Sequence, residues 1–206
     1  QGNTTGSSNV SIGDDTMKTN STASNNTAVG ASALCTNSTG TANNALGTEA
    51  LKNNTASYNT AVGTASMLSN TSGQENVAMG HDSLDANTTG GCNTTSGVSS
   101  LGKNTTGGKG SAFGFKALCA NTTGNDNNAF GFEAGCNVTT GNGNVFVGSG
   151  TSASGAGDSN AIVIGNGTSK GGQTGFINPD NGGVYQGNNS SSWSTTSDRR
   201  IKKNIT

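Results

Sequence analysis

The sequence predicts an all-β fold, a parallel β-solenoid or β-roll of about ten 17-residue coils. A short apolar motif that ends in glycine returns ten times, at Gly13, Gly30, Gly47, Gly63, Gly80, Gly97, Gly114, Gly131, Gly148 and Gly165. The interval between these glycines is constant, except that it is one residue shorter between Gly47 and Gly63. A fixed period of this kind indicates a repeat architecture. The repeat is too short for a pair of helices and lacks the apolar period of a helix, so it suits two short strands and two turns.

The composition supports a solenoid over a globule. Hydrophobic residues make up only 29% of the 206 residues, charged residues only 10%, and the net charge is −1. So few apolar residues do not fill one central core, while a column of coils needs only a thin interior. The small net charge argues against charge-driven disorder and against binding of nucleic acid. The apolar runs are too short to insert into a membrane.

Two apolar ladders are expected to point into the column. The residue before each glycine forms the first: Ile12, Val29, Leu46, Val62, Met79, Ser96, Phe113, Phe130, Val147 and Ile164. Leucines four residues after the glycine form the second, at Leu34, Leu51, Leu84, Leu101 and Leu118, with a slip by one position to Leu68. Ser96 interrupts the first ladder. We therefore expect the fifth full coil to be the weakest, and Ser96→Val to raise stability.

The coils divide the chain into four parts. Residues 1–8 resemble the end of a preceding repeat, residues 9–165 form the solenoid, residues 166–196 form a collar or linker rich in Gly, Ser and Asn, and residues 197–206 form a separate C-terminal segment. Polar turns such as Asn37–Gly40 close each coil, because Asn and Gly tolerate left-handed backbone conformations. A ladder of alanines precedes the first apolar ladder by one residue, and its small side chains allow close approach across the coil or against another chain.

The four cysteines are interpreted as small interior residues. They are Cys35, Cys92, Cys119 and Cys136, and they include no C-x-x-C pair and no neighbouring histidine, which excludes a zinc site. Cys119 and Cys136 share a repeat position on adjacent coils, close enough for a disulfide. The redox state of all four is left open.

The repeats resemble the head repeats of trimeric autotransporter adhesins. The resemblance covers roughly residues 9–165, through the Asn-x-Ala-Val-Gly motif, and it implies a trimer of parallel β-rolls. Physical reasoning also favours self-association. Each coil buries two or three apolar side chains worth about 1.5–3 kcal/mol each, while ordering a residue costs about 1–2 kcal/mol. A single column is therefore marginal, and the expected partner is a second and third copy of the chain.

The last residues resemble a different family. Ser197-Asp198-Arg199-Arg200-Ile201-Lys202-Lys203-Asn204-Ile205 looks like the opening of the endosialidase-type intramolecular chaperone domain, which ends many phage tail fibres and tail spikes. The resemblance implies that Ser197 is a nucleophile, that Lys202 is its base, and that the chain is cut just before Ser197. A neutral lysine can accept a hydroxyl proton. Only the first residues of that domain are present, so no cleavage or other enzyme activity is expected of this chain.

Three functions fit these observations. The first is a structural segment of a homotrimeric phage tail fibre or spike, extracellular on the virion, without a cofactor, that presents or forms a surface for attachment to the host. The second is an adhesin head that binds a surface glycan or protein, with Phe115 and Phe132 as an exposed aromatic pair, unless both are core or interface residues. The third, a remote alternative, is ice binding by a threonine array: Thr27, Thr39, Thr60, Thr89, Thr106 and Thr123.

Other polar residues carry no expected chemistry. His81, the single histidine, is expected to be exposed, and the aspartates lack the alternating pattern of a calcium-binding β-roll. No metal site is predicted. Asn-x-Ser/Thr sequences occur at Asn20, Asn37, Asn104 and Asn121 among others. They would carry glycans in a eukaryotic secretory setting and are turn residues in a phage or bacterial protein.

Overall fold

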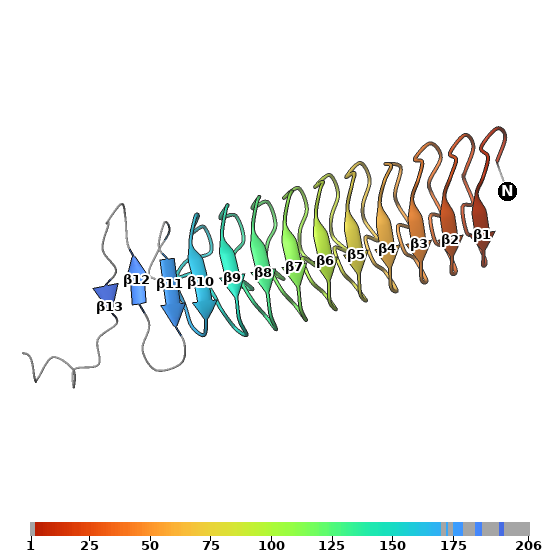
Figure 1. Cartoon of the computed structure of the whole chain (residues 1–206). Helices are drawn as coiled ribbons and strands as arrows, with labels where there is room; N and C mark the ends of the chain where they lie inside the picture. The colour runs from red at the N-terminus through yellow and green to blue at the C-terminus, as the bar shows by residue number, and fades with distance from the viewer. Residues whose placement is uncertain (1–2, 170–171, 173–174, 179–183, 187–193, 196–206) are drawn as a thin grey trace, which may run out of the picture.

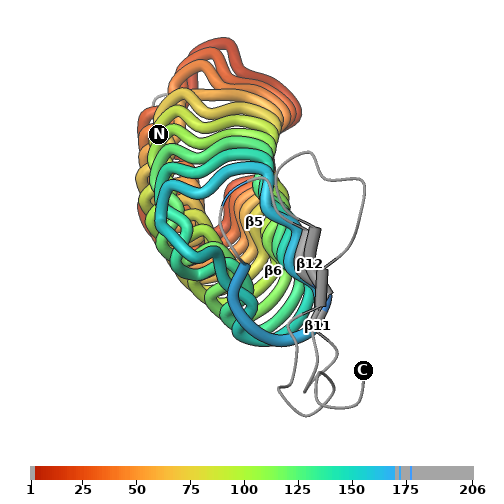
Figure 2. Tube along the Cα trace, turned by 90° about the vertical axis from the view of Figure 1, so that its left-hand side faces the viewer, coloured from red at the N-terminus to blue at the C-terminus, as the bar shows by residue number. Residues whose placement is uncertain are grey.

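The computed structural model is a column of stacked coils, as the sequence predicts. It describes residues 3–169, 172, 175–178, 184–186 and 194–195. In these residues all regular structure is β, and thirteen strands form a single sheet in chain order (Figure 1). Viewed along its axis, the column shows coils of nearly the same outline, each slightly displaced from the last (Figure 2).

Ten short strands, one per coil, build the column. They are β1 (Val10–Ile12), β2 (Thr27–Val29), β3 (Asn44–Leu46), β4 (Thr60–Val62), β5 (Val77–Met79), β6 (Thr94–Ser96), β7 (Ser111–Phe113), β8 (Asn128–Phe130), β9 (Val145–Val147) and β10 (Ile162–Gly165). Three more follow between residues 166 and 196: β11 (Gly175–Asn178), β12 (Val184–Gln186) and β13 (Ser194–Thr195).

The register places equivalent residues of neighbouring coils directly opposite one another. Strands β1 to β11 are parallel, and Ala28, Ala45 and Ala61 follow one another at the centres of β2, β3 and β4. Strand β12 then runs antiparallel to β11, and β13 antiparallel to β12. The parallel stacking therefore continues one strand beyond Gly165, the last glycine of the repeat, and ends after β11.

The interior is narrow and made of two facing walls. The strand centres supply alanines with at most 1% exposure: Ala28, Ala45, Ala61, Ala78, Ala112 and Ala129. The facing wall supplies the predicted leucines, Leu34, Leu51, Leu84, Leu101 and Leu118, which are equally buried. The inward assignment of these leucines is confirmed. The slip to Leu68 is wrong, because Met67 is completely buried at the leucine position of that coil, while Leu68 is half-buried.

The first predicted ladder points the wrong way. The residues before the glycines face outward, with Ile12 at 60% and Met79 at 43% exposure. The reason is the two-residue period of a strand: with the central alanine inside, the residues on either side of it must be outside. Ser96 is half-buried on this outward face, so it does not interrupt the interior. The polar interruption of the interior is its neighbour Thr95, which is completely buried.

A cluster of buried hydroxyls surrounds Thr95. Its Oγ1 lies within hydrogen-bond distance of Ser83 Oγ, and Ser83 Oγ lies 3.0 Å from Ser100 Oγ. Ser100 Oγ in turn donates to the carbonyl of Gly97 at 2.9 Å. The hydroxyls at this level therefore satisfy one another between buried alanines and leucines of the neighbouring coils, as buried hydroxyls must.

One coil reverses the sizes of the two walls. Phe146 stands at the strand centre, where six other coils have alanine, and Gly135 stands at the leucine position. Both are buried, and a Cβ on Gly135 would lie 2.6 Å from Cδ2 of Phe146. The large side chain has moved to the opposite wall, so the summed volume inside the coil is conserved.

The bend after each strand requires glycine. Gly63, for example, has a φ of +131°, and a Cβ there would lie 2.6 Å from the carbonyl oxygen of Gly80 on the next coil. Backbones of adjacent coils meet at this point. Larger residues are therefore excluded both by the positive φ and by the contact of their Cβ with the next coil. The backbone of the buried leucines is also in the left-handed conformation, as at Leu84 with a φ of 57°. Burial of the leucine side chain offsets the strain of about 1–3 kcal/mol.

Two ladders of buried asparagines hold the coils together. In the first, the side-chain oxygen of one asparagine accepts the backbone N–H of its equivalent one coil later, as from Asn43 to Asn26 at 2.9 Å. In the second, Asn87 Nδ2 donates to Asn70 Oδ1 at 2.8 Å and to the carbonyl of Gly90 at 2.9 Å. The sequence interpretation as turn residues missed this role, in which the amides satisfy buried polar groups of the column.

Candidate functional site on two outward faces

The outward face of the sheet carries an apolar ridge. We use this name for Ile12, Val29, Leu46, Val62, Met79, Phe113, Phe130, Val147 and Ile164. Val29 is half-buried and the other eight expose between 36% and 60% of their surface. Strands β1 to β10 contain no charged residue. Apolar side chains without charged neighbours are typical of the centre of a protein interface.

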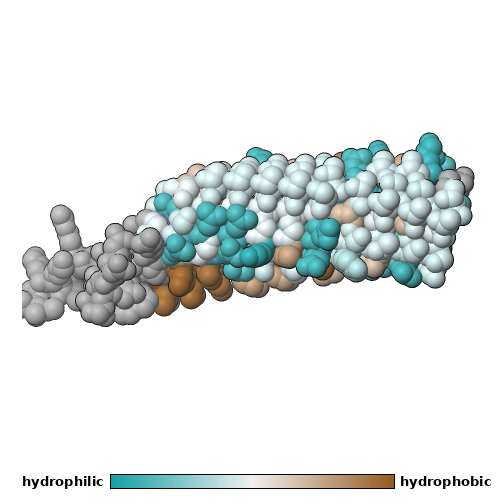
Figure 3. All heavy atoms as spheres, turned by 90° about the horizontal axis from the view of Figure 1, so that it is seen from above, coloured by the Kyte–Doolittle hydropathy of each residue, from teal (hydrophilic) through white to brown (hydrophobic). Residues whose placement is uncertain are grey.

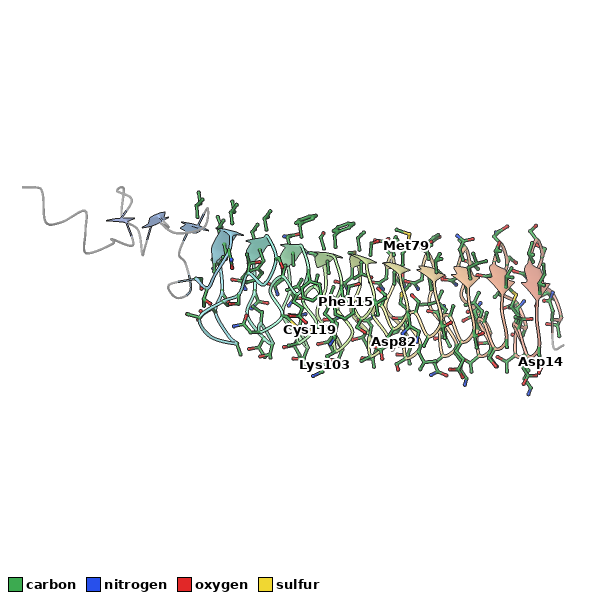
Figure 4. The ribbon with its side chains drawn as sticks, turned by 90° about the horizontal axis from the view of Figure 1, so that it is seen from below. Asp14, Met79, Asp82, Lys103, Phe115 and Cys119 are labelled. Atoms are coloured by element: carbon green, nitrogen blue, oxygen red, sulfur yellow. A yellow bond between two sulfur atoms is a disulfide. The ribbon has the colours of Figure 1, made fainter. Side chains whose placement is uncertain are left out.

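The ridge runs along the whole column with one gap, at Ser96 on β6. Phe113 and Phe130 stack with ring centroids 5.1 Å apart and an interplanar angle of 3°. Brown, apolar atoms gather along one long edge of the molecule, most densely toward the C-terminal end (Figure 3). Met79, on β5, points away from the column (Figure 4). A contiguous exposed apolar surface of this kind marks an interaction site on a soluble protein.

A groove lies on another part of the surface, beyond the bend that follows the strands. It has a volume of about 520 Å³, and its walls include Asp82 and Asp85 at one end and Lys116 and Glu133 at the other. Asp82 and Cys119, which also lines the groove, lie on the opposite side of the column from Met79 (Figure 4). We call this the corner groove.

Two small residues create the corner groove. Ser99 occupies the coil position of Asp82 and Lys116, and Gly102 occupies that of Asp85 and Cys119. One coil between two coils with larger side chains therefore lacks bulk at both positions. The sequence contains this signal, since equivalent residues of adjacent coils are neighbours, but the signal has meaning only once the outward direction of these positions is known.

The corner groove holds charges of both signs. Partial burial raises the pKa of Asp85, and the neighbouring carboxylate of Asp82 raises it further. Asp82 also lies 3.0 Å from Nδ1 of His81, whose side chain is exposed as predicted. Elsewhere on this face the equivalent positions pair opposite charges, as in Lys52 with Glu49 at 2.6 Å. The Asp82–Asp85 pair is therefore an exception.

The predicted aromatic pair is exposed. Phe115 and Phe132 expose 40% and 53% of their surface. Their rings stack with centroids 5.3 Å apart and an interplanar angle of 13°. Lys116 Nζ lies 5.2 Å from the centre of the Phe115 ring, which joins the aromatic pair to the corner groove. The alternative that both are core residues is wrong for this chain by itself.

The cysteines lie near the surface, contrary to the expectation of interior residues. Cys119 and Cys136 form a disulfide between adjacent coils, with their Cα atoms 4.9 Å apart, and both line the corner groove. Cys35 is half-buried and Cys92 is exposed, and both are free thiols. The hydrogen bond to Glu75, with a smaller contribution from burial, raises the pKa of the Cys92 thiol. The position that Cys35, Cys119 and Cys136 share lies outside the interior, whereas the two residues before it are buried.

The remaining candidate residues are distributed over the chain. Ser197 and Lys202 lie outside the described residues. Of the threonine array, Thr39, Thr89, Thr106 and Thr123 are exposed at the turns, whereas Thr27 and Thr60 are half-buried on strands, so the six do not share one flat face. The asparagines at 20, 37, 104 and 121 are buried, and their Nδ2 atoms donate hydrogen bonds to backbone carbonyls. The folded column therefore does not present them to a glycosylating enzyme.

Within the described residues, no group of three or more His, Cys, Asp and Glu side chains is arranged to hold a metal ion. The same part of the chain contains no helix of the length and apolarity that a membrane span requires. In comparisons with protein-family models, curated proteins and solved structures, nothing matches this chain. The ridge, the groove and the repeats are the features of this chain that bear on its function.

Proposed function

We propose that this chain is a structural segment of a homotrimeric viral tail fibre or spike, and that three copies associate through the apolar ridge. The observation that carries the proposal is the ridge itself, a row of outward apolar side chains on nine of the ten uncharged strands. Contact of such a surface with water is unfavourable, and burial of each large side chain in an interface would stabilise the assembly by about 1.5–3 kcal/mol.

The period of the ridge favours a second copy over an unrelated partner. Its side chains recur once per coil, at the strand spacing of roughly 4.8 Å. A partner must repeat at the same interval to contact every coil, and another column of the same chain does so by construction. Copies arranged around one axis present the same ridge to each other and close the assembly. The number three comes from the resemblance of the repeats to trimeric adhesin heads.

The place on a virion is supported by the resemblance of residues 197–205 to the chaperone domain of phage tail fibres. Such a domain would align three chains before their coils form. A uniform repeat offers many wrong registers, which a device at one end would exclude. Antibodies against residues 9–165 should label slender appendages of particles produced by a host that carries the gene. Particles without label would contradict this part of the proposal.

Analytical ultracentrifugation tests the assembly. We expect a mass of three times the chain mass of 20.2 kDa, with a far-UV spectrum dominated by β structure. The double variant Val62→Asp/Phe130→Asp places charges on the ridge and should sediment as a single chain with an unchanged spectrum. The matched control, Thr39→Asp/Thr106→Asp, places the same charges on exposed turns and should remain trimeric. A single-chain mass for the unmodified protein would refute the homotrimer, and so would a ridge variant of unchanged mass.

A further inference from the structure

The corner groove combines three features of a ligand site. Its volume of about 520 Å³ lies within the usual range for small-ligand pockets, about 300–1,000 Å³. Among its lining residues, no coil supplies both a carboxylate and an ammonium group. Lys18 and Asp15, in contrast, lie in one coil and form an ion pair. It also adjoins the exposed stacked rings of Phe115 and Phe132, through Lys116 and Glu133.

One ring face of the aromatic pair is open. Phe115 covers one face of Phe132. The equivalent position in the next coil is Ser149, which is exposed and too small to cover the other face. Phe132 accordingly keeps 53% of its surface exposed. A ligand with a flat apolar face can stack there, as bases and rings stack on exposed aromatic side chains.

We propose that the corner groove, together with Phe132, binds a neutral oligosaccharide. A sugar ring has an apolar face of C–H groups, which matches the open face of Phe132, and a rim of hydroxyls. Asp82, Asp85 and Glu133 can accept hydrogen bonds from such hydroxyls, and Lys103 and Lys116 can donate to their oxygens. Hydrogen bonds to charged groups are about twice as strong as those between neutral groups.

Charge and length select the class of glycan. The groove has three carboxylates against two ammonium groups, so it does not favour a sialylated or sulfated chain. From Asp82 to Glu133 it spans three coil steps, or about 14 Å at the strand spacing. That span exceeds one sugar ring and suits several linked residues. The groove lies away from the apolar ridge (Figure 4), so its occupation does not depend on the assembly proposed above.

The test is a glycan array probed with the labelled full chain. Its probes are neutral tetrasaccharides of glucose, galactose and N-acetylglucosamine, each beside a sialylated or sulfated counterpart. We expect binding to at least one neutral chain and weaker binding to its charged counterpart. Calorimetry with the best neutral tetrasaccharide then measures the variants. Phe132→Ala should weaken binding about tenfold or more, as for an aromatic residue at the centre of an interface.

A second variant fills the groove. Ser99 has a φ of 54°, and so has Lys116 at the same position of the next coil. Ser99→Lys therefore suits the backbone, blocks the groove and should weaken binding about tenfold as well. Tyr58→Ala, which removes an aromatic residue of 61% exposure on another part of the coil surface, is the control and should bind as the unmodified chain does.

Absence of binding to every neutral probe would overturn the proposal. A preference for the charged counterparts would do so too, as would full binding by Phe132→Ala and Ser99→Lys when their β spectra are unchanged. Each chain carries the whole groove. A monomeric protein that binds neutral glycans would therefore contradict the homotrimer and support this site, and a trimer without binding would do the reverse.

Discussion

The two walls of each coil follow opposite rules. The strand wall has its small residues inside and its large ones outside, as with Ala78 and Met79. The facing wall has its large residue inside and small or charged residues outside, as with Leu84 and Asp85. This difference indicates that, between the two walls, the interior of a coil has room for one large side chain. Apolar residues beyond that number must lie outside, where they form the ridge.

The largest expected effect on the free energy of unfolding comes from changing Phe146 and Gly135, whose sizes are reversed relative to the alanine and leucine at these positions in other coils. Phe146→Ala should destabilise the column by about 3–5 kcal/mol, because it leaves a cavity opposite Gly135. Gly135→Leu alone should also destabilise, since its side chain would meet the ring of Phe146. Urea denaturation of both variants measures the two free energies of unfolding.

The double variant Gly135→Leu/Phe146→Ala restores the arrangement of the other coils and should recover most of the loss. Leucines at this position of other coils have a φ near 50°, as in Leu118 with 52°, and Gly135 has a φ of 66°. The backbone therefore accepts the new side chain. Additive losses in the double variant would contradict the conserved volume of the two walls.

A smaller effect is expected within the second asparagine ladder. Asn87→Ala removes the donor to Asn70 Oδ1 and leaves that buried oxygen unpaired, at a cost of about 1–3 kcal/mol. Asn20 has the same place at the end of the ladder, but its side chain donates a single hydrogen bond, 3.3 Å long, and its Oδ1 has no partner in the described structure. Asn20→Ala should therefore cost clearly less in the same urea titration. Equal losses would show that the ladder does not act through its hydrogen bonds.

The buried hydroxyls predict the next effect in size. Thr95→Ala removes one partner of Ser83 and should cost about 1 kcal/mol. Thr95→Ala/Ser83→Ala gives both positions the alanine that other coils have there, such as Ala45 and Ala50, and should lie closer to the unmodified protein. Thermal unfolding of the three proteins measures the order. A double variant less stable than the single one would mean that the hydroxyl cluster stabilises the column.

The sequence predicted the fold because its strongest signals are local and periodic. The glycine that recurs once per coil marks a bend that only glycine can form, and the leucines at a fixed distance from it identify one wall. The direction of the strand wall was predicted wrongly because size was given more weight than the two-residue period of a strand. Met79 looked like a core residue, but its neighbour Ala78 is the one inside.

The candidate site could be predicted only in part. Phe115 and Phe132 were recognised as a pair because they occupy the same position in adjacent coils. The corner groove was not, since it depends on what is missing at Ser99 and Gly102 between larger neighbours on the coils to either side. The asparagine ladders were missed for a similar reason: the amides act between coils, while the turn preference of asparagine is visible within one.

The smallest expected effect concerns Ser96. With the strand wall as the structure shows it, Ser96→Val changes a half-buried residue on the outward face and leaves the interior untouched. Surface substitutions of this kind change the free energy of unfolding by no more than about 0.5 kcal/mol. The melting temperature of the Val62→Asp/Phe130→Asp background, which carries no assembled ridge if the homotrimer proposal holds, should therefore stay the same when Ser96→Val is added. A clear rise in this melting temperature would mean that residue 96 packs inside the column, and that the other ridge residues do so too.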